Sequence, residues 1–173
     1  FSKTLIQQID TLSSISSAFS NFAKMPAQQN ETLNVVEIVK LALDIFNEPY
    51  IHFMADEQEI IAKMDRTQLI RVVTNLVKNA IQAVPEVDHP RILVSVAAED
   101  GFVKIMVADN GIGIEADNRD KVFEPKFTTK SSGMGLGLGM VKTIVETYGG
   151  RIEFTSQKGK GTVFTVYLPR EKA

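Results

Sequence analysis

The fold of this 173-residue chain is decided by the stretch RILVSVAAEDGFVKIMVADNGIGI, residues 91–114. Two apolar runs, 91–98 and 102–108, flank a short polar turn that contains Gly101, and this arrangement predicts a β-hairpin. The second run ends in Asp109, and two closely spaced glycines follow it. We therefore expect an antiparallel pair of strands that carries a carboxylate at its end.

The composition bounds the class of protein. Apolar residues make up 44% of the chain and the formal net charge is −2, so a core can form and no basic field for nucleic acid is present. No apolar run approaches the ~20 residues that a membrane-spanning helix needs. The absence of cysteine excludes disulfides and cysteine-based metal sites. All eleven glycines follow position 100, so we expect the chemistry in the second half.

Residues 1–25 predict a helix, because they contain no glycine or proline and their apolar residues recur at alternating spacings of four and three. Pro26 ends this helix, and residues 27–30 are typical of a linker. The helix either packs on its own domain or pairs with a partner helix, and its long apolar seam favours the partner. A chain that begins within a helix without Met is typical of an excised fragment.

The remaining sequence alternates strands with helices. Asn34 and Asp65 are expected to cap two of the helices, and Pro85 to stop the second of them. Because the strands are joined both by helices and by hairpins, we predict an α+β fold: a two-layer sandwich of a mixed sheet with helices on one face. Helices are expected at 35–47, at 66–84 and from 136 to 148, and strands at 31–34, 50–55, 59–64, 91–98, 102–108, 151–157 and 162–168.

The longest of these helices carries a polar stripe opposite a broad apolar arc. At 100° per residue, the stripe contains Arg71, Asn75, Lys78, Asn79 and Gln82. A solvated surface is the ordinary explanation, but such surfaces favour Glu and Lys, and asparagine is a poor helix former. Two asparagines one turn apart present amide oxygens to one point, which suits a hydrated Mg²⁺ and phosphate oxygens.

The turn after Asp109 has two interpretations. It is an ordinary Asp-Asn-Gly turn, or it holds a carboxylate that accepts a hydrogen bond from an exocyclic amine such as adenine N6. In the second case, Gly113 would let the base approach the backbone closely.

The glycine run SSGMGLGLGMVK, residues 131–142, fits neither the P-loop nor the G-x-G-x-x-G pattern. Its closely spaced backbone amides precede a helix, and this combination favours an anion site. The glycines also bound a segment with Phe123, Phe127 and Lys130, which indicates a hinged lid rather than a plain flexible loop.

A family resemblance is carried by four ordered stretches, TNLVKNAIQAV, DNGIGI, VFEPKFTTK and GMGLGLG. They resemble the N, G1, F and G2 boxes of the ATP-binding catalytic domain of sensor histidine kinases. They resemble more distantly the ATPase fold of gyrase, heat-shock 90 chaperones and MutL proteins. The resemblance covers residues 31–169 and implies a Bergerat-type fold over 31–173. It also implies that residues 1–26 are the C-terminal helix of the dimerisation and histidine-phosphotransfer hairpin, with 27–30 as the linker.

The resemblance implies an ATP site with Mg²⁺. Asn75, Asn79 and Lys130 are the expected catalytic residues, with Asn79 as the Mg²⁺ ligand. Asp109 is expected to read the adenine, and Thr162 to support the base through water. The expected nucleotide-binding residues are Asn75, Lys78, Asn79, Gln82, Asp109, Gly111, Gly113, Ile114, Phe123, Phe127, Lys130, Gly133, Gly135, Leu136, Gly137, Leu138 and Thr162.

The resemblance also implies a reaction and its partners. The γ-phosphate of Mg-ATP would pass to a histidine of the dimerisation hairpin, and from there to an aspartate of a response regulator. Neither His52 nor His89 has the helical context of that acceptor, so it is expected before Phe1 and the fragment is expected not to label itself. The parent protein is expected to be a homodimer through the N-terminal helix. The domain is expected in the cytoplasm, and an inner-membrane anchor of the parent protein is left open.

Three other classes of protein carry similar boxes and remain alternatives. They are serine kinases of the anti-sigma-factor type, conformational ATPases and nucleotide-binding regulators without catalysis. In the related ATPases a glutamate that activates water stands at the position of Asn75, and asparagine cannot be that base. Tyr148 departs from the histidine that the family often has before its double glycine.

Overall fold

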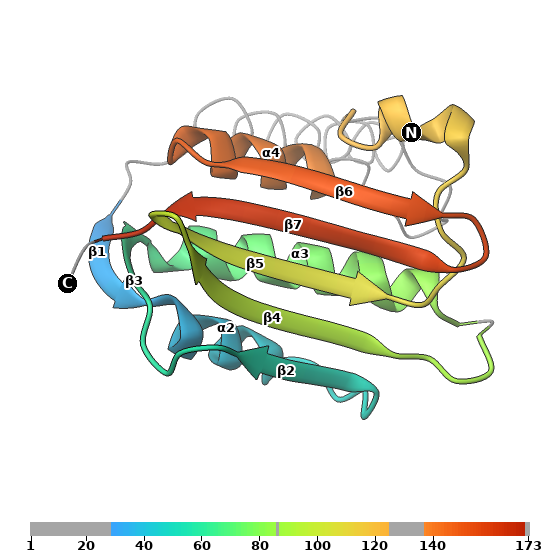
Figure 1. Cartoon of the computed structure of the whole chain (residues 1–173), viewed down its shortest axis with the longest axis horizontal. Coiled ribbons are helices and arrows are strands. Elements are labelled where there is room, and N and C mark those ends of the chain that lie inside the picture. Colours follow the sequence, from blue (N-terminus) through green and yellow to red (C-terminus); the bar gives the residue numbers. More distant parts are fainter. Residues whose placement is uncertain (1–28, 86, 125–136, 172–173) are drawn as a thin grey trace, which may run out of the picture.

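The structure is a computed structural model that describes residues 29–85, 87–124 and 137–171 (Figure 1). Strands and helices alternate along the described chain, as the sequence predicts. The strands are β1 (Asn30–Asn34), β2 (Ile51–Ala55), β3 (Ile61–Asp65), β4 (Ile92–Glu99), β5 (Phe102–Asp109), β6 (Arg151–Gln157) and β7 (Gly161–Pro169). The helices are α2 (Val35–Leu43), α3 (Arg66–Ala83), the short 3-10 helix η1 (Ala116–Lys121) and α4 (Gly137–Thr147).

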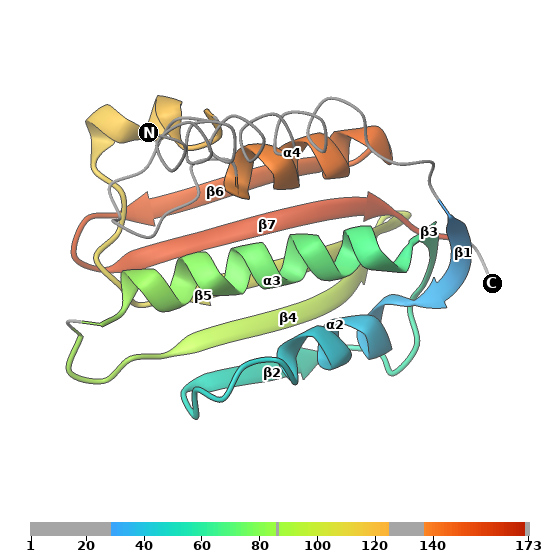
Figure 2. The ribbon, with the colours of Figure 1, turned by 180° about the vertical axis from the view of Figure 1, so that it is seen from behind.

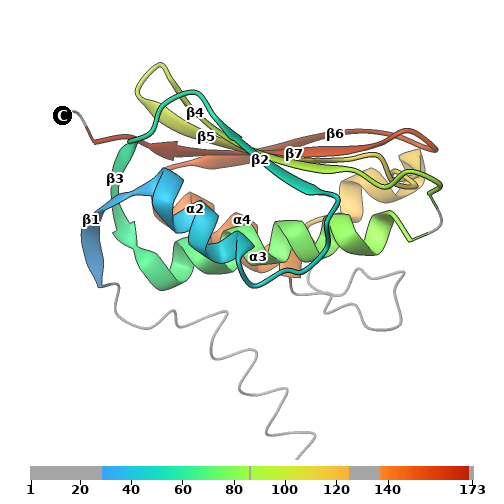
Figure 3. The same ribbon diagram turned by 90° about the horizontal axis from the view of Figure 1, so that it is seen from below.

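The main sheet is mixed, as predicted. Its five strands follow the order β2-β4-β5-β7-β6. β2 pairs with β4 in parallel, whereas β4, β5, β7 and β6 pair with one another antiparallel. Helices α2, α3 and α4 lie on one face of this sheet (Figures 2 and 3). The predicted two-layer sandwich is therefore confirmed. The predicted N-terminal helix lies outside the described residues.

A second, two-stranded sheet pairs β1 with β3 antiparallel, and the sequence did not indicate it. Each strand was expected from its own residues. Their pairing joins segments about thirty residues apart, such as Leu33 opposite Ala62, and local patterns carry no information on such partners.

Both expected helix caps are present. The side chain of Asn34 accepts a hydrogen bond from the Val36 N–H, and that of Asp65 accepts from Thr67 at the start of α3. Helix α2 ends at Leu43, earlier than the predicted residue 47. Beyond Leu43 the backbone N–H groups bond to the carbonyl three residues earlier. Such 3-10-type bonds tighten the last turn before the chain enters β2.

The hairpin of β4 and β5 closes through two residues, Asp100 and Gly101, both at positive φ. This geometry belongs to a type I′ turn, whose twist matches that of the flanking strands. Glu99 already pairs with Phe102, so the turn is one residue shorter than the predicted one.

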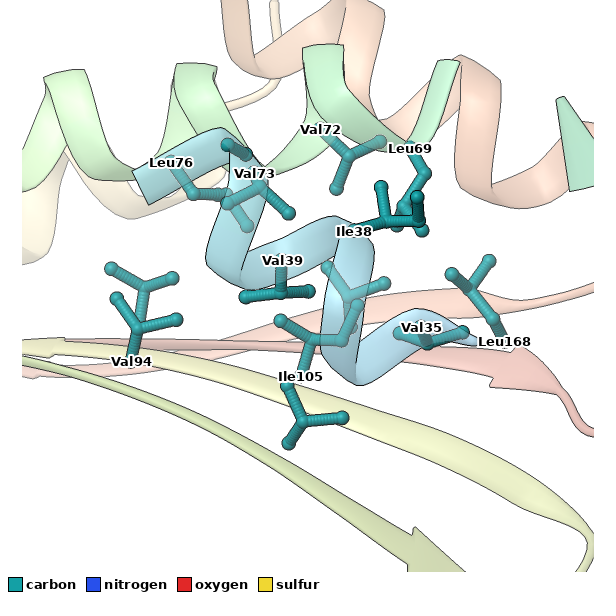
Figure 4. Close-up of a cluster of buried hydrophobic side chains, with 14 of the residues drawn as sticks. Val35, Ile38, Val39, Leu69, Val72, Val73, Leu76, Val94, Ile105 and Leu168 are labelled. Atoms are coloured by element: carbon teal, nitrogen blue, oxygen red, sulfur yellow. The ribbon is translucent and has the colours of Figure 1, made fainter. Parts of the chain in front are cut away.

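The core lies between the helices and the sheet (Figure 4). Val39 of α2, Leu76 of α3 and Ile105 of β5 are fully buried there. Burial of one such side chain contributes about 1.5–3 kcal/mol, so the apolar arc of α3 fixes how the helix is rotated. The polar stripe of α3 is consequently directed away from the core.

Candidate nucleotide site

A row of polar side chains crosses the sheet at one end. Asp109 of β5 lies directly opposite Thr162 of β7, and Thr162 lies directly opposite Ser156 of β6. The next row on the same face contains buried core residues, Val107 and Phe164. All three polar residues are buried, and Asp109 is only 9% exposed. Because buried polar groups must find hydrogen-bond partners, this end of the sheet is built as a polar site rather than as core.

The carboxylate of Asp109 takes part in the turn that follows it. Its Oδ1 accepts a hydrogen bond from the Gly111 N–H at 2.9 Å. This contact confirms the interpretation as an Asx-type turn. A carboxylate has lone pairs for about four hydrogen bonds, so the turn is compatible with a second role in accepting a hydrogen bond from a bound amine.

The loop after Asp109 is anchored on several sides. The Ile112 N–H donates to the Ala83 carbonyl at the end of α3, at 2.9 Å, and the Ile112 carbonyl accepts from the Gly159 N–H at 2.7 Å. The side chain of Asn110 accepts from the Arg91 N–H at 2.8 Å. The loop therefore joins the end of α3, the start of β4 and the turn between β6 and β7.

Two glycines of this loop are required by close contacts within the protein. A Cβ atom at Gly111 would lie 2.2 Å from the Ala83 carbonyl oxygen. Gly113 has a φ of +76°, and a Cβ there would lie 2.3 Å from the Gln157 carbonyl oxygen. The sequence was interpreted as giving Gly113 room for a base. The structure shows a separate cause, the close approach of the Gln157 backbone.

The polar stripe of α3 reaches the start of α4. Asn75 donates its amide Nδ2 to the Arg71 carbonyl at 2.7 Å, so its Oδ1 is directed away from its own helix. A Cβ added to Gly137 would lie 3.2 Å from that Oδ1. Asn75 and the first residue of α4 are thus neighbours, as Figure 2 shows for their helices. Farther along the stripe, Asn79 is half-buried.

Phe123 is the described part of the expected lid. Its ring packs edge-on against Phe154 at 5.8 Å and against Phe164 at 6.4 Å between centroids. The Lys142 Nζ lies 5.3 Å from the centroid of the Phe123 ring, within the range of a cation–π contact. Phe123 is therefore anchored on the core next to the polar row.

The structure brings several expected residues together and leaves others outside. Asp109, Thr162, Gly111 and Gly113 lie at one end of the sheet, and Ile114 and Leu138 pack against the core nearby. Lys78 and Gln82 are exposed on α3. The expected residues that lie outside the described part of the chain are Phe127, Lys130, Gly133, Gly135 and Leu136.

Sequence reasoning missed Ser156 and Arg119. Ser156 accepts hydrogen bonds from the Ile114 N–H and, through its backbone carbonyl, from the Arg119 guanidinium. The last hairpin turns at residues 158–160, so pairing outward from that turn would have placed Ser156 opposite Thr162. Arg119 carried no local signal, because its partner lies 37 positions away.

The two histidines lie where the sequence indicated. His52 is exposed on β2, and His89 lies in the loop before β4. None of the helices in the described residues is both long and apolar enough to cross a membrane.

Comparisons with known proteins agree with this architecture. Residues 64–172 match the family model described as histidine kinase-, DNA gyrase B- and HSP90-like ATPase. The sensor histidine kinase ZraS of Escherichia coli K12 is 44% identical over 119 residues, which are 69% of this chain and 25% of ZraS. ZraS of Salmonella typhimurium is 32% identical over an alignment of 173 positions, which covers 96% of this chain and 37% of that protein.

A solved structure shows the same fold. The nucleotide-free catalytic domain of the histidine kinase ThkA has a TM-score of 0.74 and 30% sequence identity, and the match covers 82% of this chain and 96% of that domain. The chain spans only 25% and 37% of the two curated relatives. It belongs to the histidine kinase-, DNA gyrase B- and HSP90-like ATPase family, as the catalytic ATP-binding domain of a sensor histidine kinase.

Proposed function

We propose that this domain holds Mg-ATP between the polar row and α3, and that its γ-phosphate passes to a histidine on the dimerisation hairpin of the parent protein. The observation that carries the proposal is the buried pair of Asp109 and Thr162 at the end of the sheet. An acceptor-only carboxylate in a buried row is suited to the amine of a purine base.

The adenine end of the site follows from that pair. Asp109 would accept a hydrogen bond from the exocyclic N6 amine, while the turn to Gly111 holds the carboxylate in place. Thr162 would contact the base edge directly or through water. The loop of Gly111 and Gly113 is fixed against Ala83 and Gln157, so this wall is formed before the nucleotide binds.

The phosphate end would lie along the polar stripe of α3. Asn79 is the proposed Mg²⁺ ligand, and Asn75 lies one turn earlier with its Oδ1 toward Gly137. Among the described residues, no group of three or more acidic or histidine side chains could hold a metal. A hard cation bound here would therefore take most of its oxygens from phosphates and water, as Mg²⁺ does in nucleotide sites. Bound Mg²⁺ would offset the negative charge of the phosphates.

The chemistry required of the protein is mainly positioning. Phosphoryl transfer proceeds through charge stabilisation and alignment of the attacking and leaving groups. Asn75 donates to the Arg71 carbonyl and is a neutral amide, which is too weak a base to take a proton from water. This supports transfer to a protein side chain over hydrolysis.

The proposal includes the parts of the parent protein that lie beyond this domain. Residues 1–26 would be the second helix of the dimerisation hairpin, which would form a homodimer, and residues 27–30 the linker. The phosphoryl group would then pass from that histidine to an aspartate of a response regulator. Because neither His52 nor His89 lies on a helix, this chain alone is proposed to bind ATP without labelling itself.

The test is incubation with γ-labelled ATP and Mg²⁺, with and without the upstream hairpin of the parent protein supplied as a separate polypeptide. We expect acid-labile label on the hairpin, lost when its histidine is replaced by alanine, and no label on this chain. Acid-stable label would indicate a serine kinase, and release of phosphate without label would indicate an ATPase. Label at His52 or His89 would also overturn the proposal.

A further inference from the structure

We infer that Ser156 is a positioning residue of the base pocket, which orients the hydroxyl of Thr162 as a donor toward the bound base. The inference rests on the proposed function, because it assumes that Asp109 and Thr162 contact the base. Ser156 itself lies one strand farther from Asp109 than Thr162 does. It therefore acts through Thr162.

The hydroxyl of Ser156 has contacts on all sides. It accepts a hydrogen bond from the Ile114 N–H at 2.8 Å. It lies 2.8 Å from the Thr162 Oγ1, and either hydroxyl can be the donor. It also lies 3.2 Å from the Gly161 carbonyl oxygen, to which it can donate. Ser156 is 7% exposed, so bulk water does not compete for these positions.

Hydrogen-bond accounting leaves two arrangements. A serine hydroxyl has one proton and two lone pairs, and the Ile114 N–H occupies one lone pair. If Ser156 donates to Thr162, the Thr162 proton is not used in this contact and is available to the pocket. If Ser156 donates to Gly161, Thr162 donates to Ser156 and presents only lone pairs to the pocket. The proton of Ser156 thus decides whether Thr162 offers the pocket a donor or an acceptor.

The neighbouring carboxylate favours the first arrangement. Asp109 and Thr162 are directly opposite on adjacent strands, where Cβ atoms lie about 4.5–5.5 Å apart. A Thr162 oxygen that presents only lone pairs to the pocket would place two electron-rich oxygens together beside the Asp109 carboxylate, whereas a hydroxyl with its proton on the pocket side reduces that repulsion. We therefore assign Ser156 as the donor and Thr162 as a donor into the pocket.

This polarity matches adenine. Adenine carries an amine donor at N6 and an acceptor at N1, so the carboxylate of Asp109 serves the first and the hydroxyl of Thr162, directly or through water, the second. Guanine presents an acceptor at O6, which a carboxylate would repel. Ser156 contributes to base selection because it fixes the proton that the N1 acceptor needs.

Ser156 also fixes the wall of the pocket. Besides the bond from Ile114, the backbone carbonyl of Ser156 accepts from the guanidinium of Arg119 on η1. Gly113 lies against the next residue of β6, where a Cβ would be 2.3 Å from the Gln157 carbonyl oxygen. Ser156 thus contacts both the pocket loop and the Thr162 hydroxyl, and holds them in a fixed relation to each other.

The experiment is a double-mutant cycle of Ser156→Ala and Thr162→Val, in which the measured quantity is discrimination between two bases. Isothermal titration calorimetry gives the dissociation constants of Mg-ATP and of 1-deazaadenosine triphosphate, which lacks the N1 acceptor, for each variant. The ratio of the dissociation constant of the 1-deaza analogue to that of Mg-ATP is expected to be about 5–10 for the unmodified chain, which corresponds to one neutral hydrogen bond. Ser156→Ala should lower the ratio to about 2 and Thr162→Val to about 1. The double variant should show no further change.

The controls separate this role from a structural one. Thr155→Ala removes an exposed hydroxyl from the same strand and should leave the ratio unchanged. Ser156→Thr keeps the hydroxyl and should restore the ratio. Ser156→Cys, a near-isosteric weak donor, should lower it and serves if the alanine variant does not fold. An unchanged ratio in Ser156→Ala, or a further fall on adding it to Thr162→Val, overturns the inference. If Asp109→Asn does not weaken ATP binding, the proposed site itself fails instead.

Discussion

The hydroxyl of Tyr148 accepts a hydrogen bond from the backbone N–H of Asp65, at 3.0 Å, and thereby joins the end of α4 to the start of α3. The same hydroxyl donates to the Asn30 Oδ1 at 3.0 Å, at the start of β1. The Asp65 carboxylate in turn accepts from the Gln29 N–H at 3.0 Å. Tyr148 therefore joins the end of α4, the start of α3 and the start of β1.

Replacement of Tyr148 by Phe should lower the free energy of unfolding by about 1–2 kcal/mol, because the part-buried Asp65 N–H loses its acceptor. Urea denaturation of the domain measures this change. Tyr167→Phe is the matched control: the Tyr167 side chain is half-buried and its ring packs edge-on against Phe102, and we expect a change below about 0.5 kcal/mol when its hydroxyl is removed. Equal losses in both variants would contradict a specific role for Tyr148.

The stability of the domain should depend on Asp65 at acid pH. Hydrogen bonds from Gln29, Thr67 and Gln68 lower the pKa of Asp65 below its ordinary value of 3.8, against the opposing effect of burial. A lowered folded-state pKa gives stability that is fully present above 3.8. That stability is lost as the pH falls through the folded-state pKa.

Urea denaturation at a series of pH values tests this dependence. Below pH 3.8 the unfolding free energy of the unmodified chain should fall more steeply with decreasing pH than that of Asp65→Asn. Parallel curves for the two proteins would show that the carboxylate carries no such linkage.

Gly111→Ala should displace the loop that follows Asp109, whose carboxylate is proposed to read the base. The added Cβ would lie 2.2 Å from the Ala83 carbonyl oxygen, so the backbone must shift. We expect ATP affinity to fall at least about tenfold, because the turn holds Asp109. Gly101→Ala is the control: it is strained by a φ of +81° but meets nothing within 4 Å. That variant should lose about 1–2 kcal/mol of stability and keep its ATP affinity, and the same loss of affinity in both would contradict the account.

Phe123→Ala should weaken the anchoring of the segment after η1. The ring loses its edge-on packing against Phe154 and Phe164, and the unfolding free energy should fall by about 2–3 kcal/mol. Phe123→Leu keeps apolar contact and should retain more than half of that stability. Thermal unfolding followed by circular dichroism measures both, and an alanine variant as stable as the original chain would exclude an anchoring role.

Local signals predicted much of the fold. The caps Asn34 and Asp65 and the hairpin around residues 99–101 depend on residues a few positions apart, and the structure confirms the caps and the hairpin, with the turn reduced to Asp100 and Gly101. Asp109 was singled out because it ends an apolar strand and precedes glycines. These features need no knowledge of which strands become neighbours.

What the sequence did not reveal depends on strand order and register. Leu33 faces Ala62 and Ser156 faces Thr162 only because particular strands pair, and the hydrophobic pattern of each strand is the same whatever its partner. The close contact of Gly113 with the Gln157 backbone likewise joins distant segments. The role of Ser156 could therefore be inferred only once the rows of the sheet were known.

The most direct test of the nucleotide site is calorimetric titration of Mg-ATP into the unmodified chain and into Asp109→Asn. The asparagine keeps an oxygen for the Gly111 N–H but replaces the carboxylate that would accept from adenine N6. Affinity should fall at least about tenfold, the value of a hydrogen bond to a charged group. Asp120→Asn, on the exposed surface of η1, should bind as the original chain does. Equal affinities for the unmodified chain and Asp109→Asn would contradict the account.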